Sequence, residues 1–317
     1  MKHFMAFTAA ALCACAALAQ PFPSKAVKIV VPFARGGNLD VTARLVGEHM
    51  SKTLGQPVVV ENRPGAGGNV AAQQVAKAQA DGYTLLVTTS AFAVNPNLKR
   101  DAGYDPSKEY VTVNLIGGTP NLLVASPEFA GTTLKDVFRL AKTEKLSYGS
   151  AGAGTTPHLC AEYLFKTLNK ADIVHVPFNG AGPALNAVAG NQIPLASVAL
   201  SSAVELVKAG RVKPLAVTST KRVTSLPHVP TVAESGYPGF SFLTWVGVFA
   251  PAKTPRAALE RLNSESNMIL FVPEFQQQLD RAGFSPIGGS LAKANDTLQD
   301  ELRKYAKVIR DTGITAD

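Results

Sequence analysis

The residues best suited to chemistry in this sequence stand in two glycine-containing segments. The first reads Arg35-Gly36-Gly37-Asn38, with Asp40 close behind it. The second, residues 149–156, reads GSAGAGTT and carries three hydroxyl side chains. Adjacent glycines permit a sharp turn or a close approach of another molecule to the backbone. Backbone N–H groups and hydroxyls donate hydrogen bonds, so both segments favour an anion such as a carboxylate. A tight turn without a ligand is the alternative, and it leaves the hydroxyls unassigned.

Other chemistries fit these residues less well. A dinucleotide site needs a third glycine and an acid after the next strand, whereas Asp172 precedes the apolar run at residues 173–177. Ser150 lacks the G-x-S-x-G spacing of a hydrolase nucleophile. His158 and Cys160 stand two apart, so on a helix they point to different faces, and no second pair has zinc spacing. We therefore expect no catalytic residue, no metal and no cofactor.

Residues 1–19 have the features of a cleaved secretory signal peptide. Lys2 precedes an apolar run over residues 4–18, and the small residues at its end predict cleavage after Ala19. The run is too short to span a membrane, and no later stretch reaches the roughly 18 apolar residues of a spanning helix. Lipid attachment at Cys15 is the alternative, disfavoured by the bulky Cys13. The sequence predicts a soluble, exported protein.

Composition narrows the possible partners. The chain has 317 residues and a net charge of +8, from 31 Lys and Arg against 23 Asp and Glu. The basic residues are scattered and not interleaved with aromatic residues, which argues against nucleic acid. Once the signal peptide is removed only Cys160 remains, so no intrachain disulfide is possible. The length favours two domains, whose cores must supply the stability.

Apolar strand patterns alternate with helical patterns along the chain, which predicts α/β layers with largely parallel sheets. Strands are expected at residues 27–33, 58–61, 84–88, 122–125, 146–149, 173–177, 193–198, 215–218 and 245–250. Helices are expected at residues 40–54, 69–78, 134–143, 157–168 and 181–189. Both glycine segments, and also residues 64–69 and 179–183, open helical segments. This repetition could place helix N-termini on opposite sides of one cleft, where they favour carboxylate or phosphate groups.

Single residues near the glycine segments have more than one interpretation. Asp40 has three interpretations: an acid in the first turn of the helix, a brace for the loop, or a contact to the ligand. We favour the brace, because a carboxylate directed at a dicarboxylate ligand would repel it. Phe33 and Phe178 each end a predicted strand and either join the core or wall the cleft. Cys160 is predicted to be a small core residue. His49, His175 and His228 belong to no recognisable constellation.

Several stretches together resemble the Bug family, the extracytoplasmic solute receptors of tripartite tricarboxylate transporters. They are VPFARGGNLDVTARLV, LGQPVVVENRPGAGGNVAAQQVAKAQADGYTLL, AVNPNL, LSYGSAGAGTTPHL, IVHVPFNGAGPAL, LAVTSTKR, LPHVPTVAESG and WVGVFAPAKTP. The resemblance implies a periplasmic protein with the type II periplasmic binding-protein fold, in which two α/β lobes enclose a ligand cleft. We expect lobe 1 to comprise residues 20–123 and 226–317, and lobe 2 to comprise residues 124–225.

The resemblance also implies a binding site, because in that family the two glycine loops bind ligand carboxylates through backbone amides, hydroxyls and ordered waters. The candidate ligand-binding residues are Phe33, Ala34, Arg35, Gly37, Asn38, Asp40, Thr89, Ser90, Ser150, Ala151, Gly152, Gly154, Thr155, Thr156, His158, Phe178, Asn179 and Gly180. Two departures stand out. Arg35 replaces the family's usual small residue or Pro, and Val198-Ala199 replaces an Asp-Asn pair found in many members, which weakens the case for an amino-acid ligand.

The expected function is therefore that of a monomeric, non-enzymatic receptor. It would capture a small mono-, di- or tricarboxylate and deliver it to the membrane subunits of a tripartite tricarboxylate-type transporter. The alternatives are an orphan receptor that reports ligand occupancy to a sensor, and an exported enzyme of the same fold. The enzyme is disfavoured because the sequence shows no nucleophile–base pair.

Overall fold

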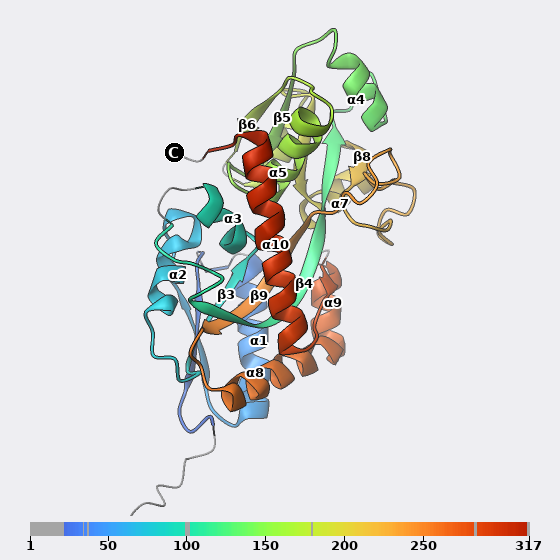
Figure 1. The fold of residues 1–317 in the computed structure, drawn as a ribbon. Coiled ribbons are helices and arrows are strands. Elements are labelled where there is room, and N and C mark those ends of the chain that lie inside the picture. The colour runs from blue at the N-terminus through green and yellow to red at the C-terminus, as the bar shows by residue number, and fades with distance from the viewer. Residues whose placement is uncertain are drawn as a thin grey trace, which may run out of the picture.

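The computed structural model describes residues 22–33, 35–36, 38–98, 102–178, 180–281 and 284–315. The predicted signal peptide, its cleavage site and Cys15 lie outside these residues. Figure 1 shows an elongated molecule of two halves, with a long helix running along both of them. Within the described part of the chain, no helix combines the length and the apolar character needed to cross a membrane.

The first half is built on parallel strands. β1 (Val27–Val31) lies between β2 (Val58–Asn62) and β3 (Thr84–Thr89), and β9 (Leu243–Pro251) runs antiparallel beside β3. The helices of this half are α1 (Asn38–Leu54), α2 (Asn69–Ala76), α3 (Ala91–Leu98), α8 (Arg256–Met268), α9 (Pro273–Arg281) and α10 (Leu291–Thr312).

Helices cover both faces of this sheet because successive strand side chains point to opposite sides. Ile29 packs on one face with α1 and α8, whereas Val30 packs on the other with α2, α3 and α10. The apolar stripe of α1, which includes Val46 and Met50, is fully buried on the sheet. The alternating apolar residues of the strands therefore pack into two core layers, one on each face of the sheet.

The second half repeats the parallel arrangement. β5 (Leu146–Ser150) lies between β6 (Ile173–Pro177) and β7 (Leu195–Ala199), with parallel pairing on both sides. Its helices are α4 (Leu134–Leu140), α5 (Thr156–Glu162), α6 (Ala181–Ala189) and α7 (Leu200–Lys208). α5 continues into a π-helical segment, Tyr163–Leu168.

One strand, β4 (Tyr110–Ala125), belongs to both halves. Its residues 110–120 pair antiparallel with β9, and residues 121–125 pair antiparallel with β7. β8 (Lys213–Val217) also pairs with its last residues, and the short β10 (Ser285–Pro286) pairs with its middle. Every residue of β4 except Val111 is buried. β4 therefore joins the two halves into one continuous mixed sheet.

The chain returns to the first half through residues 218–242, and this return segment is fastened to β4 where it leaves β8. The hydroxyl of Thr218 accepts a hydrogen bond from the N–H of Asn121 (2.8 Å) and donates to the carbonyl oxygen of Phe242 (2.5 Å). Thr218 is fully buried, as is Asn121. The two connections between the halves therefore meet at one hydroxyl group.

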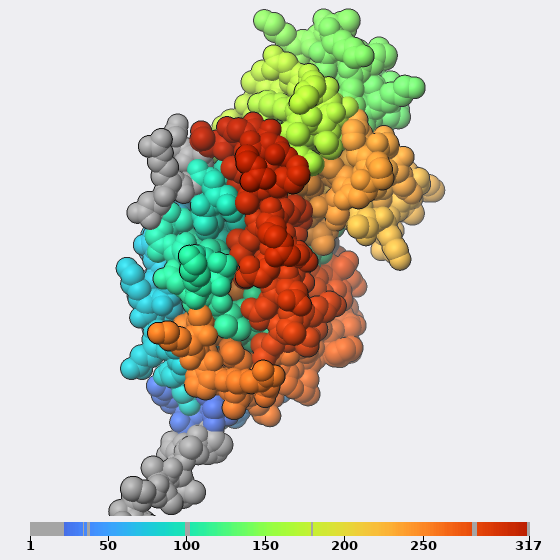
Figure 2. Space-filling view, viewed as in Figure 1, coloured from blue at the N-terminus to red at the C-terminus, as the bar shows by residue number. Residues whose placement is uncertain are grey.

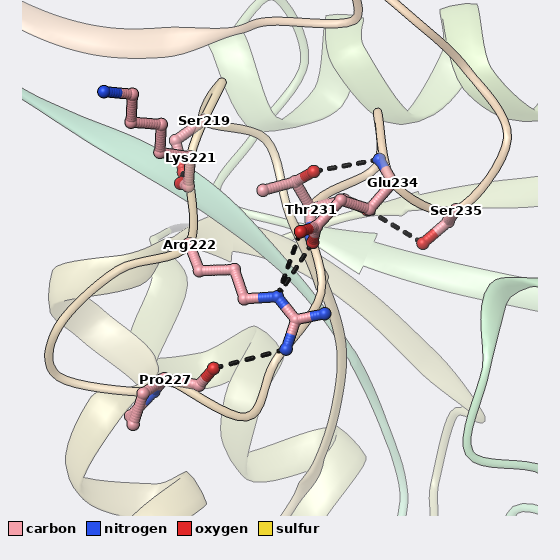
Figure 3. A network of polar contacts seen from close by, with 7 residues as sticks. All are labelled: Ser219, Lys221, Arg222, Pro227, Thr231, Glu234 and Ser235. Atoms are coloured by element: carbon pink, nitrogen blue, oxygen red, sulfur yellow. Dashed lines mark hydrogen bonds and ion pairs between the residues drawn. The ribbon is translucent and has the colours of Figure 1, made fainter.

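Further along, the return segment is held by a polar network that joins exposed side chains to the buried Thr231, shown in Figure 3. Arg222 pairs with Glu234 (2.9 Å), and the same carboxylate oxygen of Glu234 accepts the N–H of Thr231 (2.8 Å). The hydroxyl of Thr231 accepts the N–H of Glu234 in return (3.0 Å). This reciprocal pair is the arrangement of a capping box, and it fixes the turn between residues 231 and 234.

The predicted strands are all present, and the α/β fold class is confirmed. The expectation of largely parallel sheets is wrong at the centre, where β4 and β9 pair antiparallel with their neighbours. The prediction for residues 122–125 captures only the end of β4. The predicted helix at residues 157–168 divides into α5 and the π-helical segment.

The Thr218→Val substitution tests the joint between the halves. It should lower the free energy of unfolding by about 2–4 kcal/mol, because it leaves a buried N–H and a buried carbonyl without partners while preserving the side-chain shape. Urea denaturation measures the loss. The exposed Thr132→Val serves as the control and should change stability by less than about 0.5 kcal/mol. An equal effect in both variants would contradict the assigned role.

Candidate ligand-binding site

The first glycine loop follows β1 and is held by one buried carboxylate. Oδ2 of Asp40 accepts hydrogen bonds from the N–H of Gly36 (2.9 Å) and from Nε of Arg44 (3.0 Å). Oδ1 of Asp40 accepts from Nδ2 of Asn62 (2.8 Å), which also donates to the carbonyl oxygen of Phe33 (2.9 Å). Asp40 and Asn62 therefore fix the entry and the turn of this loop, as the brace interpretation of Asp40 predicts.

The charge of Asp40 is balanced inside the protein. Burial alone would raise the pKa of this carboxyl, but hydrogen bonds from Arg44, Gly36 and Asn62 lower it to about 2. Asp40 is thus ionised at neutral pH, and Nη2 of Arg44 lies 2.9 Å from its Oδ1. Because this charge already has a partner, it opposes a nearby anion much less than a free carboxylate would.

The second glycine loop follows β5 and is held by its own hydroxyls. Oγ of Ser150 accepts a hydrogen bond from the N–H of Gly152 (3.2 Å). Oγ1 of Thr155 donates to the carbonyl oxygen of Gly152 (2.8 Å) and accepts from the N–H of His158 at the start of α5 (3.5 Å). These side chains fix the shape of the loop and the direction of its backbone amides. The hydroxyls identified in the sequence therefore form hydrogen bonds within the loop and with the start of α5.

Two stacked histidines support this loop from behind. The rings of His158 and His175 lie 3.9 Å apart between centroids, and Nε2 of His175 is 2.7 Å from Oγ of Ser150. Nδ1 of His158 accepts the N–H of Gly154 (3.1 Å), so its proton is on Nε2 in the neutral form. Burial lowers the pKa of His158 to about 3, and the neighbouring His175 and Lys166 act in the same direction. The pKa of His175 is also lowered, mainly by burial, so both rings are neutral at neutral pH.

His175 is a correction to the sequence interpretation, which placed it in no constellation. It stands on β6, and the parallel pairing of β6 with β5 brings it beside Tyr148 and Ser150. His175 and His158 are far enough apart in sequence that only this strand pairing brings them together.

The two halves touch at the second glycine loop. The hydroxyl of Ser90, which follows β3, lies 2.7 Å from the hydroxyl of Thr156, the first residue of α5, and both residues are buried. Gly154 has a φ of +78°, and a Cβ there would meet Cδ1 of Leu98 on α3 at 2.8 Å. The positive φ favours glycine, and a side chain here would require Leu98 to shift. The carboxyl end of β3 in one half thus meets the glycine loop of the other half.

A third glycine segment, residues 64–69, is fixed by asparagine side chains. Nδ2 of Asn95 on α3 donates to Oδ1 of Asn69 (2.8 Å) and to the carbonyl oxygen of Gly67 (3.0 Å). Gly65, Gly67 and Gly68 all have positive φ, which explains the glycine-rich sequence that precedes α2. The AVNPNL stretch therefore holds the turn that the PGAGGN stretch makes.

Phe178 and Gly180 adjoin the second loop. The N–H of Phe178 donates to the carbonyl oxygen of Ser150 (3.1 Å), and that of Gly180 donates to the carbonyl oxygen of Ala151 (3.2 Å). The ring of Phe178 packs against the core of the second half, whereas Phe33 is exposed and does not join a core.

Two further predicted residues, Thr89 and Arg35, belong to the first half. Thr89 ends β3 and is half-buried, and Arg35 is exposed, with no hydrogen bond or ion pair to the described residues. No hydrogen bond between described residues connects Phe33, Gly36 or Asp40 directly to the second loop. Ala34, Gly37, Asn179 and the side chain of Asn38 lie outside the described part of the structure.

The structure gives no alternative site for metal chemistry among the described residues, where no group of three or more His, Cys, Asp or Glu side chains could hold a metal ion. Cys160 is fully buried, and burial raises the pKa of its thiol to about 12. Its predicted place in the core is confirmed.

Comparison with known proteins identifies the family. The sequence model of the tripartite tricarboxylate transporter family receptors matches residues 42–314. The chain belongs to this family. This receptor has the same fold as the periplasmic binding protein BugD, with a TM-score of 0.77 and 32% identity over 93% of this chain and 100% of BugD. The resemblance to the Bug family and the two-lobe periplasmic binding-protein fold are thereby confirmed.

Two solved relatives of this receptor contain bound ligands. R. palustris Rpa4515, solved with adipate, is 35% identical, has a TM-score of 0.80, and is matched over 93% of this chain and 99% of its own. MatC (Rpa3494) from Rhodopseudomonas palustris, solved with bound malate, is 33% identical, has a TM-score of 0.77, and is matched over 91% of this chain and 100% of its own. Both relatives align with this receptor over nearly the whole chain.

The Asp40→Asn substitution tests the brace of the first loop. At neutral pH it should lower the free energy of unfolding by about 1–3 kcal/mol, because it replaces an acceptor of charged hydrogen bonds. The pKa of Asp40 is lower in the folded protein than its ordinary value, so its stabilising effect is complete above pH 3.8 and is lost as the pH falls toward about 2. The difference between wild type and Asp40→Asn should therefore shrink over this interval.

Denaturation by urea at a series of pH values measures this difference. The Asp172→Asn variant is the control, since Asp172 is exposed and has no hydrogen-bond partner among the described residues. It should match the wild type at every pH. A difference between wild type and Asp40→Asn that stays constant from pH 7 to about pH 2 would rule out the ionised brace.

Proposed function

We propose that this receptor captures a small dicarboxylate between its two halves in the periplasm and delivers it to the membrane subunits of a tripartite tricarboxylate-type transporter. The observation that carries the proposal is the meeting of the two halves at the second glycine loop, where Ser90 contacts Thr156. Each half presents a glycine loop after a parallel strand, and each loop is braced by buried side chains. A ligand with an acid group at each end suits two such loops.

The relatives support the choice of ligand class. Adipate and malate, the ligands in the two solved relatives, are both dicarboxylates, and they differ in length and polarity. Recognition of this kind depends mainly on backbone N–H groups and neutral hydroxyls, because Asp40 is already paired and both histidines are neutral. The proposed binding residues remain the predicted ones, with His175 added as a residue that positions Ser150.

The alternative of an enzyme rests on one contact that the sequence did not predict. Oγ of Ser150 and Nε2 of His175 lie 2.7 Å apart, which is the distance of a nucleophile–base pair. However, Ser150 is fully buried and its oxygen also bonds Gly152. A role in shaping the loop explains this contact without catalysis. An orphan receptor that signals to a sensor has the same binding site, so only the membrane partner distinguishes it from a transport receptor.

Isothermal titration calorimetry with adipate, malate and citrate tests the proposal, together with native mass spectrometry of the freshly purified protein. At least one dicarboxylate should bind with a stoichiometry of one and be recovered unchanged. Ser150→Ala should weaken that binding by about tenfold, because it removes a hydroxyl that orients Gly152 and His175. Ser147→Ala, on the same strand, is the matched control and should bind normally. Absence of any carboxylate binding would refute the proposal, and turnover of the bound acid would favour the enzyme.

Arg35 provides a separate test of how the ligand is attracted. Because this cation is exposed and has no described partner, it should steer anions toward the first loop, an effect that salt screens over about 10 Å at moderate ionic strength. Arg35→Ala should therefore slow association at low salt and match the wild type at high salt. Stopped-flow binding kinetics measure both rates. Arg211→Ala, which removes an exposed charge after the end of α7, is the control. A faster dissociation that persists at high salt would instead indicate direct contact with the ligand.

A further inference from the structure

A hollow of about 400 Å³ lies outside the predicted binding residues. Three segments line it: the π-helical segment after α5, the return segment at residues 236–242, and the last turns of α10. Figure 1 shows α10 extending along both halves, and Figure 2 shows that the outer surface of α10 is open to solvent. The volume falls in the range of about 300–1,000 Å³ that is typical of small-ligand sites.

Aromatic rings form the wall of this hollow. Tyr163 stacks on Phe240 with 6.3 Å between ring centroids and 24° between planes, and Phe242 lies 5.0 Å from Phe240. Gly236 and Gly239 face open space, since a Cβ at either position would meet no atom within 4 Å. The hollow is therefore apolar on one side, and no side chain from these glycines fills it.

The π-helical segment contributes two residues to the same wall. Hydrogen bonds in a π-helix connect residues five apart, and such turns recur at functional sites. Here Tyr163 and Leu168 are five apart, and both line the hollow. Leu168 is 41% exposed, so it offers apolar surface to the hollow.

Two ammonium groups stand at the aromatic wall. Nζ of Lys304 lies 5.1 Å from the ring centroid of Phe242, and Nζ of Lys307 lies 5.9 Å from that of Tyr163. Lys304 is paired with Glu301 and Lys307 with Asp311. An ammonium group has three donors, so each lysine can still donate to a second acceptor. The hollow thus combines flat apolar surfaces with donors that favour an anion.

We propose that this hollow is a second ligand site that binds a small aromatic carboxylate. The ring of the ligand would lie against Tyr163, Phe240 and Leu168, and its carboxylate would accept hydrogen bonds from Lys304 and Lys307. Stacking favours a planar ring at this wall, and the two cations favour a negative group at its edge. The site is independent of the dicarboxylate proposed for the glycine loops, because it shares none of their residues.

Benzoate is a suitable probe, and the protein contains its own reporter. Trp245 is the single tryptophan of the sequence. Its Nε1–H donates to Oε2 of Glu301 (3.1 Å), the residue that pairs with Lys304. A carboxylate that binds Lys304 competes with Glu301 and should change the emission of Trp245 in a saturable way. Calorimetry with benzoate gives the affinity independently.

Three variants locate the probe. Lys307→Gln and Leu168→Glu should each weaken benzoate binding by about fivefold or more, because one removes a positive charge and the other adds a repelling negative charge. Arg303→Gln, on the exposed side of α10, is the matched control and should leave the affinity unchanged. Thermal unfolding verifies that each variant folds. If Leu168→Glu does not fold, the exposed Lys307→Gln is enough to test the site.

The dicarboxylate site must be separated from this one in the same experiment. Benzoate should bind Ser150→Ala as it binds the wild type, and saturating adipate or malate should not displace it. Loss of benzoate binding in Ser150→Ala with full binding in Lys307→Gln would place the probe between the glycine loops and overturn the proposal. Absence of saturable benzoate binding to the wild-type protein would overturn it as well.

Discussion

The structure depends on one strand that is hydrogen-bonded in both halves at once. β4 pairs with β9 in the first half and with β7 and β8 in the second. Because the parallel strands of each half are built outward from this shared strand, the end of β3 and the loop after β5 come within hydrogen-bond distance at Ser90 and Thr156. Thr218 ties the return segment to the same strand.

The electrostatic design of the candidate site follows from burial. The buried carboxylate of Asp40 is ionised and forms an ion pair with Arg44. The imidazole of His158 stays neutral because burial lowers its pKa. In the proposed binding mode, the groups that meet the ligand are oriented backbone N–H groups and hydroxyls. Such groups are already directed before a ligand arrives, so little reorganisation is needed on binding. Arg35 is an added, exposed cation, and its effect is expected on the rate of encounter more than on recognition.

Several stretches that carry the family resemblance have an architectural explanation. Asn95 holds Asn69 and thereby the glycine turn before α2. Arg222 and Glu234 come from two separate stretches of the resemblance, and their ion pair fixes the return segment. These side chains are partnered within the protein, and no hydrogen bond or ion pair between described residues joins them to a predicted site residue. Some of the motifs that identify the family therefore fix turns and segments of the fold.

The sequence alone determined the elements whose signals are local. Apolar runs followed by glycines predicted β1, β5 and the loops after them, because turn geometry is encoded in adjacent residues. The middle of β4, with Gly117-Gly118 and Pro120, interrupts the apolar strand pattern, and pairing with β9, more than 120 residues away, keeps it in the strand. His175 likewise joined the site only through the pairing of β6 with β5. Contacts between distant segments depend on which strands pair, and the pairing is decided by the packing of the whole chain. Local sequence signals do not encode it.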